Sequence, residues 1–314
     1  MGSGMARESW PSTGMLTFRA LLWLLPGMAL TCQASEAWWQ STVLQQGSPG
    51  LSGTLGQPFG VAVGPDGALY VTEVTHHRIL RLDLDTGQTR VIAGTGQAGY
   101  SGDGGPATKA ALNEPYEVRF DAEGNLYVVE MRNHLVRRIR RRDGVIETVA
   151  GTGKPGFGGD GGPARHAQLR RPHSIEIAGS KLWIADIGNH RIREVDLESG
   201  KITTIAGNGE AALPQDGQPA RGRPVAGPRA LAWDGRVLWV ALREGHSIWQ
   251  LDVERDRWKH VAGTGQRGYA GDGGPAAAAQ FAGPKGLALG PDGSVWISDT
   301  ENGAIRRIDP KTHR

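Results

Sequence analysis

Short runs of alternating hydrophobic and polar residues recur along most of the chain, and each run ends at a turn signal. In the first set these runs cover residues 61–63, 68–71, 79–83 and 89–93. The first two are joined by Gly-Pro-Asp-Gly, in which proline presets φ and glycine supplies a positive φ. The runs are short and rich in β-branched residues. They therefore predict four short β-strands and almost no helix.

This four-strand pattern repeats five times with a nearly constant period. Each unit opens on a proline, at intervals of 57, 57, 56 and 56 residues: Pro58, Pro115, Pro172, Pro228 and Pro284. A four-stranded sheet repeated around an axis is a β-propeller. The sequence thus predicts an all-β fold, a propeller of five four-stranded blades, in one domain that covers residues 35–314.

The last unit has only three predicted strands, around Leu287, Val295 and Ile305. Ahead of the first unit, residues 41–47 resemble residues 147–153, which contain the fourth strand of the second unit. An open sheet edge favours pairing with another strand. We therefore expect the N-terminal strand to complete the last blade.

The N-terminus has the features of an export signal. Arg19 precedes an apolar run at residues 20–30, which is too short to span a bilayer. Small residues at the −3 and −1 positions favour cleavage after Ala34. A start at Met15 would give a more compact signal, so residues 1–14 are a candidate over-called start.

A signal peptide at residues 1–34 predicts an extracytoplasmic protein, either periplasmic or secreted. Two alternatives remain. The apolar run could be a buried core segment, or Cys32 could carry a lipid anchor. The anchor is less favoured because Ala29 and Thr31 do not match the Leu and Gly/Ala that bacterial lipoproteins prefer before the cysteine.

Composition narrows the class of protein further. Glycine accounts for 48 of 314 residues, roughly twice its usual share, but without the triplet period of collagen. One cysteine cannot form an internal disulfide. No run of 18 apolar residues exists, so we expect no transmembrane segment. The net charge of +3 permits an anionic partner without requiring one.

The repeats resemble a known family. Asn-His-Leu at residues 133–135 and Asn-His-Arg-Ile-Arg at 189–193, each after an aromatic-containing strand, are similar to NHL repeats. The intervening Ala-Gly-Thr-Gly-x-x-Gly-(Tyr/Phe)-x-Gly-Asp-Gly-Gly-Pro-Ala resembles the long-loop type of exported bacterial NHL proteins and of the teneurin propeller. The resemblance covers about residues 41–310. It implies a propeller, and because many members have six blades, six is the family-based alternative to five.

The same resemblance leaves the function open. NHL-type and related propellers include protein-binding and RNA-binding modules, amidating lyases, streptogramin lyase and gluconolactonase-like hydrolases. A shared fold does not confer a shared activity. The function therefore has to be argued from individual residues.

Three sets of polar residues recur with the repeat, and we interpret all three as structural. The first set is the long-loop aspartates, which are expected to cap the short turn that follows: Asp103, Asp160, Asp272 and, in a degraded copy, Asp216. Calcium binding is the alternative. It is less favoured because each loop offers one carboxylate, whereas calcium takes six to eight oxygens. The histidines are expected to hydrogen-bond within tight turns: His77, His134, His190 and His246. The acids that end each second strand are expected to cap the next loop: Glu73, Glu130, Asp186 and Asp299.

Residues that vary while the repeat stays constant are the best functional candidates. The position after each opening proline is predicted to face the central channel, and it holds Phe59, Tyr116, His173, Arg229 and Lys285, with Glu117 one residue further on. This mouth is aromatic on one side and cationic on the other. It suits a ligand with an apolar or sugar-like face and an anionic group, with Arg229 as a fork donor.

An enzyme is the alternative interpretation. In a lyase or lactonase, Glu117 and His173 would move protons. A single divalent metal would need further acids, for which Glu117, Glu130 and Asp186 are weak candidates. Otherwise no cofactor is expected. No nucleophile elbow or phosphate loop is present.

A group of arginines after the third strand of the second unit could bind phosphate or present a solvated face: Arg137, Arg138, Arg140, Arg141 and Arg142. Export argues against nucleic acid as a partner. The sequence thus predicts an exported, monomeric binding or scaffolding module for a protein, a glycan or a small anionic ligand, which it binds at its loop-rich face.

Overall fold

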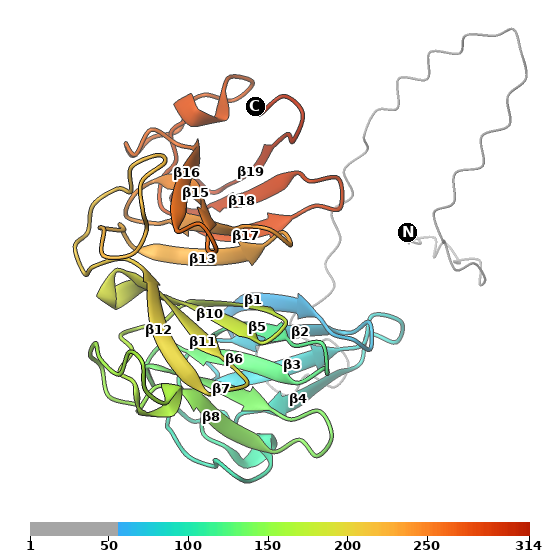
Figure 1. The fold of residues 1–314 in the computed structure, drawn as a ribbon. Helices are drawn as coiled ribbons and strands as arrows, with labels where there is room; N and C mark the ends of the chain where they lie inside the picture. The colour runs from blue at the N-terminus through green and yellow to red at the C-terminus, as the bar shows by residue number, and fades with distance from the viewer. Residues whose placement is uncertain (1–55) are drawn as a thin grey trace, which may run out of the picture. The chain divides into compact units, whose positions relative to one another are not determined.

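The computed structural model describes residues 56–314, which form five antiparallel sheets (Figure 1). Each predicted repeat unit becomes one sheet, so the predicted five-bladed β-propeller is confirmed. Helical structure in this part of the chain is limited to five three-residue 3-10 turns. The predicted signal peptide at 1–34 and the predicted closing strand at 41–47 lie outside the described residues.

The first two blades follow the chain without crossovers. Blade 1 contains β1 (Pro58–Val63), β2 (Leu69–Glu73), β3 (Arg78–Leu82) and β4 (Thr89–Ala93). Blade 2 contains β5 (Pro115–Phe120), β6 (Leu126–Glu130), β7 (Leu135–Ile139) and β8 (Ile146–Ala150).

The remaining blades keep this order. Blade 3 contains β9 (Ser174–Ala178), β10 (Lys181–Asp186), β11 (Arg191–Asp196) and β12 (Lys201–Ala206). Blade 4 contains β13 (Pro228–Trp233), β14 (Leu238–Leu242), β15 (Ser247–Asp252) and β16 (Arg257–Ala262). Blade 5 contains β17 (Pro284–Leu289), β18 (Val295–Asp299) and β19 (Ala304–Ile308).

Glycines provide the backbone shapes that the short strands need at their ends. Gly67 closes the first turn with φ +75°, and its N–H donates to the carbonyl of Gly64 at 2.9 Å. Gly151 follows β8 with φ +97°, and a Cβ there would lie 2.5 Å from the carbonyl oxygen of His134. A larger residue at either position would be strained.

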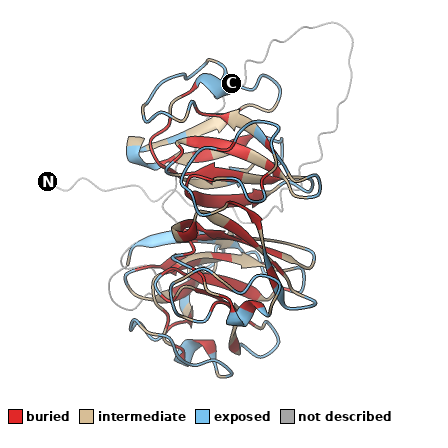
Figure 2. Ribbon diagram, turned by 60° about the vertical axis from the view of Figure 1, so that its left-hand side comes forward, coloured by how far each residue is buried: buried red, intermediate tan, exposed pale blue. Residues whose placement is uncertain are grey.

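The hydrophobic core lies between neighbouring blades, and Figure 2 shows the strands mostly buried. Between blades 1 and 2, for example, Ile79 packs with Leu112, Val118 and Ile146, all of which are buried. Similar clusters join blades 2 and 3, 3 and 4, and 4 and 5. The innermost strand of each blade packs against that of the next, from β1 through β5, β9 and β13 to β17.

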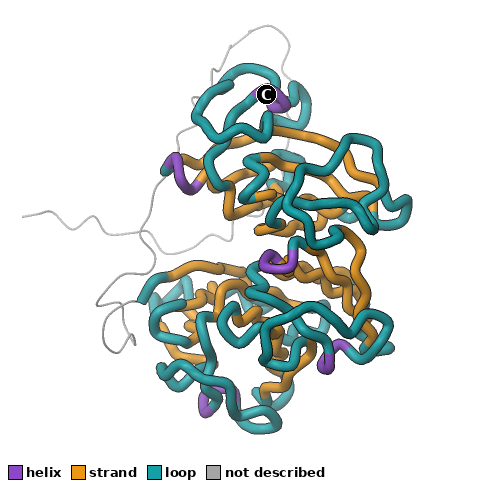
Figure 3. The backbone as a smooth tube through the Cα atoms, turned by 90° about the vertical axis from the view of Figure 1, so that its left-hand side faces the viewer, coloured by secondary structure: helices purple, strands orange, loops and turns teal. Residues whose placement is uncertain are grey.

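Long loops connect each blade to the next (Figure 3). Three of them contain a 3-10 turn: η1 (Ala107–Lys109), η2 (Ala164–His166) and η4 (Ala276–Ala278). Buried Ala107, Ala110 and Leu112 seat the first loop on the sheets. Two further turns, η3 (Ile187–Asn189) and η5 (Thr300–Asn302), follow β10 and β18. Within residues 56–314, no helix has the length and apolar character needed to cross a membrane.

Candidate ligand site in the central channel

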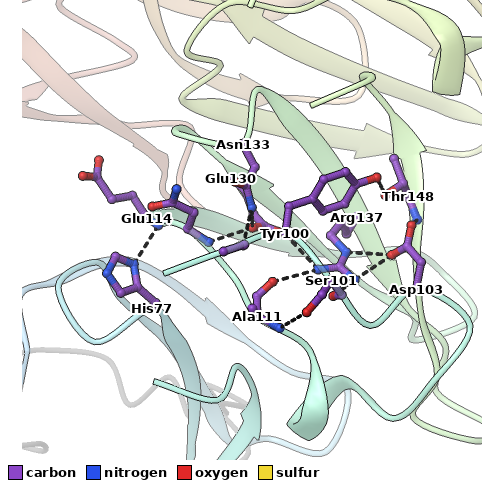
Figure 4. Close-up of polar contacts among 12 residues, drawn as sticks. His77, Tyr100, Ser101, Asp103, Ala111, Glu114, Glu130, Asn133, Arg137 and Thr148 are labelled. Atoms are coloured by element: carbon purple, nitrogen blue, oxygen red, sulfur yellow. Dashed lines mark hydrogen bonds and ion pairs between the residues drawn. The ribbon is translucent and has the colours of Figure 1, made fainter. Parts of the chain in front are cut away.

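A buried arginine on the third strand organises the polar residues around blade 2 (Figure 4). The Arg137 side chain is fully buried. Its Nε and Nη2 donate to Oδ1 of Asp103 in the long loop, at 3.0 and 2.6 Å, and its Nη1 lies 3.5 Å from Oε1 of Glu130. A buried charge is stable only when it is paired and hydrogen-bonded. The long-loop aspartate therefore serves as the partner of a buried cation.

This arrangement recurs in two other blades. Arg193 lies 2.7 Å from Asp160 and 3.4 Å from Asp186. In blade 5, Arg306 Nη2 lies 2.6 Å from Oδ1 of the loop residue Asp272, and Arg306 Nη1 lies 3.5 Å from Oδ2 of Asp299. In blade 4 the same strand positions hold Trp249 and Leu242, which pack in an apolar cluster instead.

The predicted role of the loop aspartates is therefore wrong in its detail. They do not cap the 3-10 turns: Pro106, Pro163 and Pro275 occupy the cap positions, and no side chain hydrogen-bonds there. Sequence reasoning missed the arginine partner because it lies 33 or 34 residues further along the chain. The structure also corrects the placement of Arg137, which is buried rather than part of an exposed arginine patch.

The acids that end the second strands have the predicted structural role. Glu130 Oε2 accepts hydrogen bonds from the Asn113 N–H at 2.8 Å and from Asn133 Nδ2 at 2.6 Å. Burial raises the pKa of Glu130 to about 7, and nearby Arg137 opposes this rise. The pKa of Asp186 rises to about 6, also through burial.

The repeated histidines connect neighbouring blades. His77, His134, His190 and His246 all have positive φ, between 45° and 55°. Each Nδ1 accepts a hydrogen bond from a backbone N–H just before the opening proline of the following blade, at 3.0 to 3.2 Å. The predicted hydrogen bonding is confirmed, but its partner is the next blade and not the histidine's own turn.

The predicted channel residues lie at irregularities where the first strands begin. In blades 2, 4 and 5 the opening proline pairs with the end of the second strand, and the pairing resumes two residues later. The extra residues are Tyr116, Arg229 and Lys285. Such bulges redirect a side chain out of the ladder. The proline favours this because it has no N–H to give to the sheet.

Three of the predicted residues form a row of rings. The Phe59 and Tyr116 rings are 4.5 Å apart and tilted by 56°. The Tyr116 and His173 rings meet edge to face at 4.7 Å. The Arg229 guanidinium lies 5.2 Å from the Phe59 ring centre and 5.3 Å from that of Tyr116. The structure therefore brings together one aromatic wall and one cation.

Arg229 is the buried cation of this site. It is 7% exposed, and its Nε has no hydrogen-bond partner. The two carboxylates whose charges act on Arg229 pair with other arginines, Glu117 with Arg119 and Glu244 with Arg243. Burial lowers the pKa of Arg229 to about 10. The guanidinium thus lies beside the rings of Phe59 and Tyr116 and lines the cavity, with its buried Nε unpartnered.

The other predicted residues differ in their surroundings. Burial, and then Arg243 and Arg229, lower the pKa of half-buried Lys285. His173 donates from Nδ1 to the Arg171 carbonyl at 2.8 Å, and burial lowers its pKa to about 2. His173 is therefore neutral, which corrects the expectation that it adds positive charge. Glu117 is paired with Arg119.

The structure does not bring the weak metal candidates together. Glu117, Glu130 and Asp186 each pair with a different arginine. Within the described part of the chain, no three His, Cys, Asp or Glu residues form a group suited to a metal. A histidine with a pKa of about 2 is also a weak base at neutral pH. His173 is thus a weak candidate for the base of a proton transfer.

A cavity of about 540 Å³ joins these residues. Its lining includes five of the six predicted residues, Phe59, Glu117, His173, Arg229 and Lys285, and does not include Tyr116. It also includes residues that sequence reasoning missed: Arg119, Leu287, Trp296 and Ile305. These lie further along the strands of blades 2 and 5. All four residues lie outside the positions next to the opening prolines, which carried the sequence prediction.

Comparisons with known proteins agree with the repeat and the fold. A model of the NHL repeat matches residues 281–308. Protein SUPPRESSOR OF QUENCHING 1, chloroplastic, from Arabidopsis thaliana is 32% identical over 168 residues, which cover 51% of this chain and 16% of that protein. NHL repeat-containing protein 2 from Gallus gallus is 26% identical over 222 residues, 63% of this chain and 30% of its own.

Two further matches extend over more of the chain. Teneurin-1 from Mus musculus is 23% identical over 292 residues, 77% of this chain and 10% of its own length. The chain spans less than a third of each of these relatives. A solved structure described as an auxiliary nutrient binding protein from Bacteroides ovatus superposes with a TM-score of 0.58 at 14% identity, covering 82% of this chain and 60% of that one. This likeness shows the fold alone.

Five radial sheets with a channel between their first strands define a β-propeller. The chain thus contains a match to the NHL repeat at residues 281–308, and the relatives and the fold support a place among the NHL-repeat β-propellers.

Proposed function

We propose that this propeller is an extracytoplasmic binding module whose central channel binds a ligand with an anionic group on a flat ring. The NHL propeller fold supports a binding or scaffolding role in general. The observation that carries the finer proposal is Arg229, a buried guanidinium without a carboxylate partner in residues 56–314. The predicted signal peptide supports a location outside the cytoplasm.

The electrostatics of the mouth favour an anion. The pKa values of both Arg229 and Lys285 are lowered, partly by other nearby cations. An anion bound between them would relieve this unfavourable charge. A neutral ligand would leave Arg229 desolvated and unpaired. A guanidinium can also bind a carboxylate through two parallel hydrogen bonds.

The rings favour a flat ligand. Phe59 is 45% exposed, although it stacks with Tyr116. An exposed aromatic face beside a cation suits the apolar face of a sugar ring or an aromatic acid. Acidic sugars and aromatic carboxylates combine both features, and they are the ligand class that we propose.

The test compares acids with their neutral counterparts. Calorimetric titration would use glucuronate and indole-3-acetate against glucose and indole-3-ethanol. We expect the acids to bind more tightly, and Arg229→Met to weaken their binding by about tenfold or more, because a charged hydrogen bond contributes about 1.5–3 kcal/mol. Arg90→Met is the matched control, since Arg90 is exposed on the edge strand β4.

Folding must be checked alongside binding. Arg229→Met removes a buried charge, so its melting temperature should equal or exceed that of the parent chain. Equal affinity for acids and neutral analogues, or full affinity in folded Arg229→Met, would contradict the proposed ligand class.

A further inference from the structure

The first strands of the blades carry charge on one side of the ring only. In blades 1, 4 and 5 the positions two and four residues after the opening proline hold only glycine or alanine: Gly60 and Ala62, Ala230 and Ala232, Gly286 and Ala288. In blades 2 and 3 three of the four equivalent residues are charged, and we call them the channel triad: Glu117, Arg119 and Glu176. The cavity that contains the channel site is lined by four of the small residues and by Glu117 and Arg119. It therefore offers open space beside one charged wall.

The channel triad joins two blades through one guanidinium. Nη2 of Arg119 pairs with Oε1 of Glu117, and Nε of Arg119 lies 3.4 Å from Oε2 of Glu176 in the next blade. Nη1 of Arg119 donates to the Val118 carbonyl at 2.9 Å. Within residues 56–314, neither acid pairs with a second cation. Two carboxylates thus share one positive charge, which leaves an excess negative charge when all three groups are ionised.

This excess charge lies in a confined place. The three side chains of the channel triad are between 16% and 21% exposed. Burial raises the pKa of Glu176, Arg119 opposes the rise, and the negative charge of Glu117 adds to it. One carboxylate would be enough to neutralise Arg119, so an ion pair between the blades does not account for the second acid. A cation next to the two acids would relieve their repulsion.

The same cavity contains a charge of opposite sign at its mouth. Arg229 is 7% exposed, its Nε has no hydrogen-bond partner, and it lines the cavity together with Glu117 and Arg119. The negative charge of Glu117 also acts on Arg229. The cavity therefore offers an unpartnered cation at one place and an excess negative charge at another. A ligand that is only an acid would match the first and leave the second unbalanced.

We propose that the channel triad binds an ammonium group of the same ligand, so that the ligand is a zwitterion with its two charges at separate ends of a ring. The proposal rests on the proposed function, because Arg229 holds the acid end. An ammonium group has three donors, and carboxylate oxygens accept such charged hydrogen bonds. Glu117 and Glu176 would accept them, while Arg119 keeps the two acids together. Acidic amino sugars and aminoalkyl ring acids form the ligand class.

A ligand series that differs in one group tests the ammonium site. Calorimetric titration would compare 4-(aminomethyl)benzoate, 4-(hydroxymethyl)benzoate and 4-methylbenzoate, which share the ring and the carboxylate. We expect the aminomethyl compound to bind the unsubstituted chain about tenfold or more tightly than the methyl compound, because it adds charged hydrogen bonds. The hydroxymethyl compound should lie between them.

A matched pair of variants assigns the effect to the channel triad. Glu117→Gln keeps the size of the side chain and removes its charge. It should reduce the advantage of the aminomethyl compound to about twofold or less, while 4-methylbenzoate binds at least as tightly as before. Glu147→Gln is the control, because Glu147 also pairs with an arginine, Arg138, but lies on the outer strand β8. It should keep the full advantage. Glu176→Gln replaces Glu117→Gln if the latter fails to fold.

The outcomes separate this inference from the proposed function. If 4-methylbenzoate binds and the aminomethyl compound binds no more tightly, the ammonium site is refuted and the acid site stands. Tighter binding of the hydroxymethyl compound than of the aminomethyl compound would also refute it, in favour of a neutral polar group. If none of the three acids binds, the proposed function fails, and benzylamine decides the rest. Binding of benzylamine that Glu117→Gln abolishes would support the triad as an ammonium site, and absence of binding would refute it.

Discussion

At the scale of single residues, the channel mouth combines an unpaired cation with a histidine that burial keeps neutral. His173 is 7% exposed and lies edge to face against Tyr116. Its Nδ1 hydrogen-bonds to the Arg171 carbonyl, so the ring has a fixed orientation. Burial, and then the nearby positive charge of Arg229, lower the pKa of His173 to about 2. Protonation in acid therefore favours the unfolded chain.

This predicts that His173 makes the protein less stable in mild acid. The unfolded chain takes up a proton on this histidine below its ordinary pKa of about 6.5, whereas the folded chain does not. Between pH 7 and pH 5, His173 should lower the free energy of unfolding by about 2 kcal/mol. Urea denaturation of the parent chain and of His173→Gln at both pH values isolates this contribution, because Glu130 and Asp186, whose pKa values are raised, change the stability of both chains in the opposite direction.

His173→Gln should remove most of that pH dependence while keeping a hydrogen-bond donor. His166→Gln is the control, because His166 is exposed in η2. An unchanged pH dependence in His173→Gln would show that the buried ring does not cause it.

At the scale of elements, blades 2, 3 and 5 are each held to the long loop before them by an arginine that lies under that loop. Arg137 joins the loop through Asp103 and the second strand through Glu130. Blade 4 shows that the sheet also tolerates an apolar solution, with Trp249 and Leu242 in place of the pair. The ion pair is therefore one of two ways to fill the same space.

A double-mutant cycle tests this interpretation. Arg137→Met or Glu130→Leu alone should cost about 3–5 kcal/mol, because each leaves a buried partner without its counter-charge. The double variant should be about 1–3 kcal/mol more stable than the sum of the two losses predicts. Denaturant unfolding gives all four free energies. Simple additivity would mean that the two groups do not interact.

At the scale of the whole molecule, four blade junctions repeat the same contacts, and the loops around them carry aspartates that resemble calcium ligands. In the structure these carboxylates already accept hydrogen bonds from other groups of the chain. Asp103 binds Arg137 and the Thr148 N–H, and Asp160 binds Arg193 and the Thr204 hydroxyl. A cation would have to compete with a buried arginine at each loop.

We therefore expect calcium to leave the melting temperature of the chain unchanged. Scanning calorimetry in EDTA and in added Ca²⁺, with Mg²⁺ as the control for ionic strength, makes the comparison. A calcium-specific rise together with three bound ions per chain would instead assign the repeated loops to calcium.

The strands and the blade number could be predicted because they depend on local periodicity. The pairing of Asp103 with Arg137 could not be predicted from spacing alone, because it joins residues 34 positions apart. A signal was nevertheless present. The three units that follow an intact long loop carry arginine on the third strand, and the unit that follows the degraded loop carries Trp249. The neutral state of His173 depends on burial, which only the packed ring of blades reveals.

The histidine contacts between blades have a consequence for how such a chain can change in length. Every unit from the first to the fourth offers an Nδ1 acceptor between its second and third strands, and a backbone donor directly precedes the proline of every following unit. A gene that duplicated one 56- or 57-residue unit would encode two new neighbours that already possess both halves of this contact. Blade number could thus increase in one recombination event, without the evolution of a new interface.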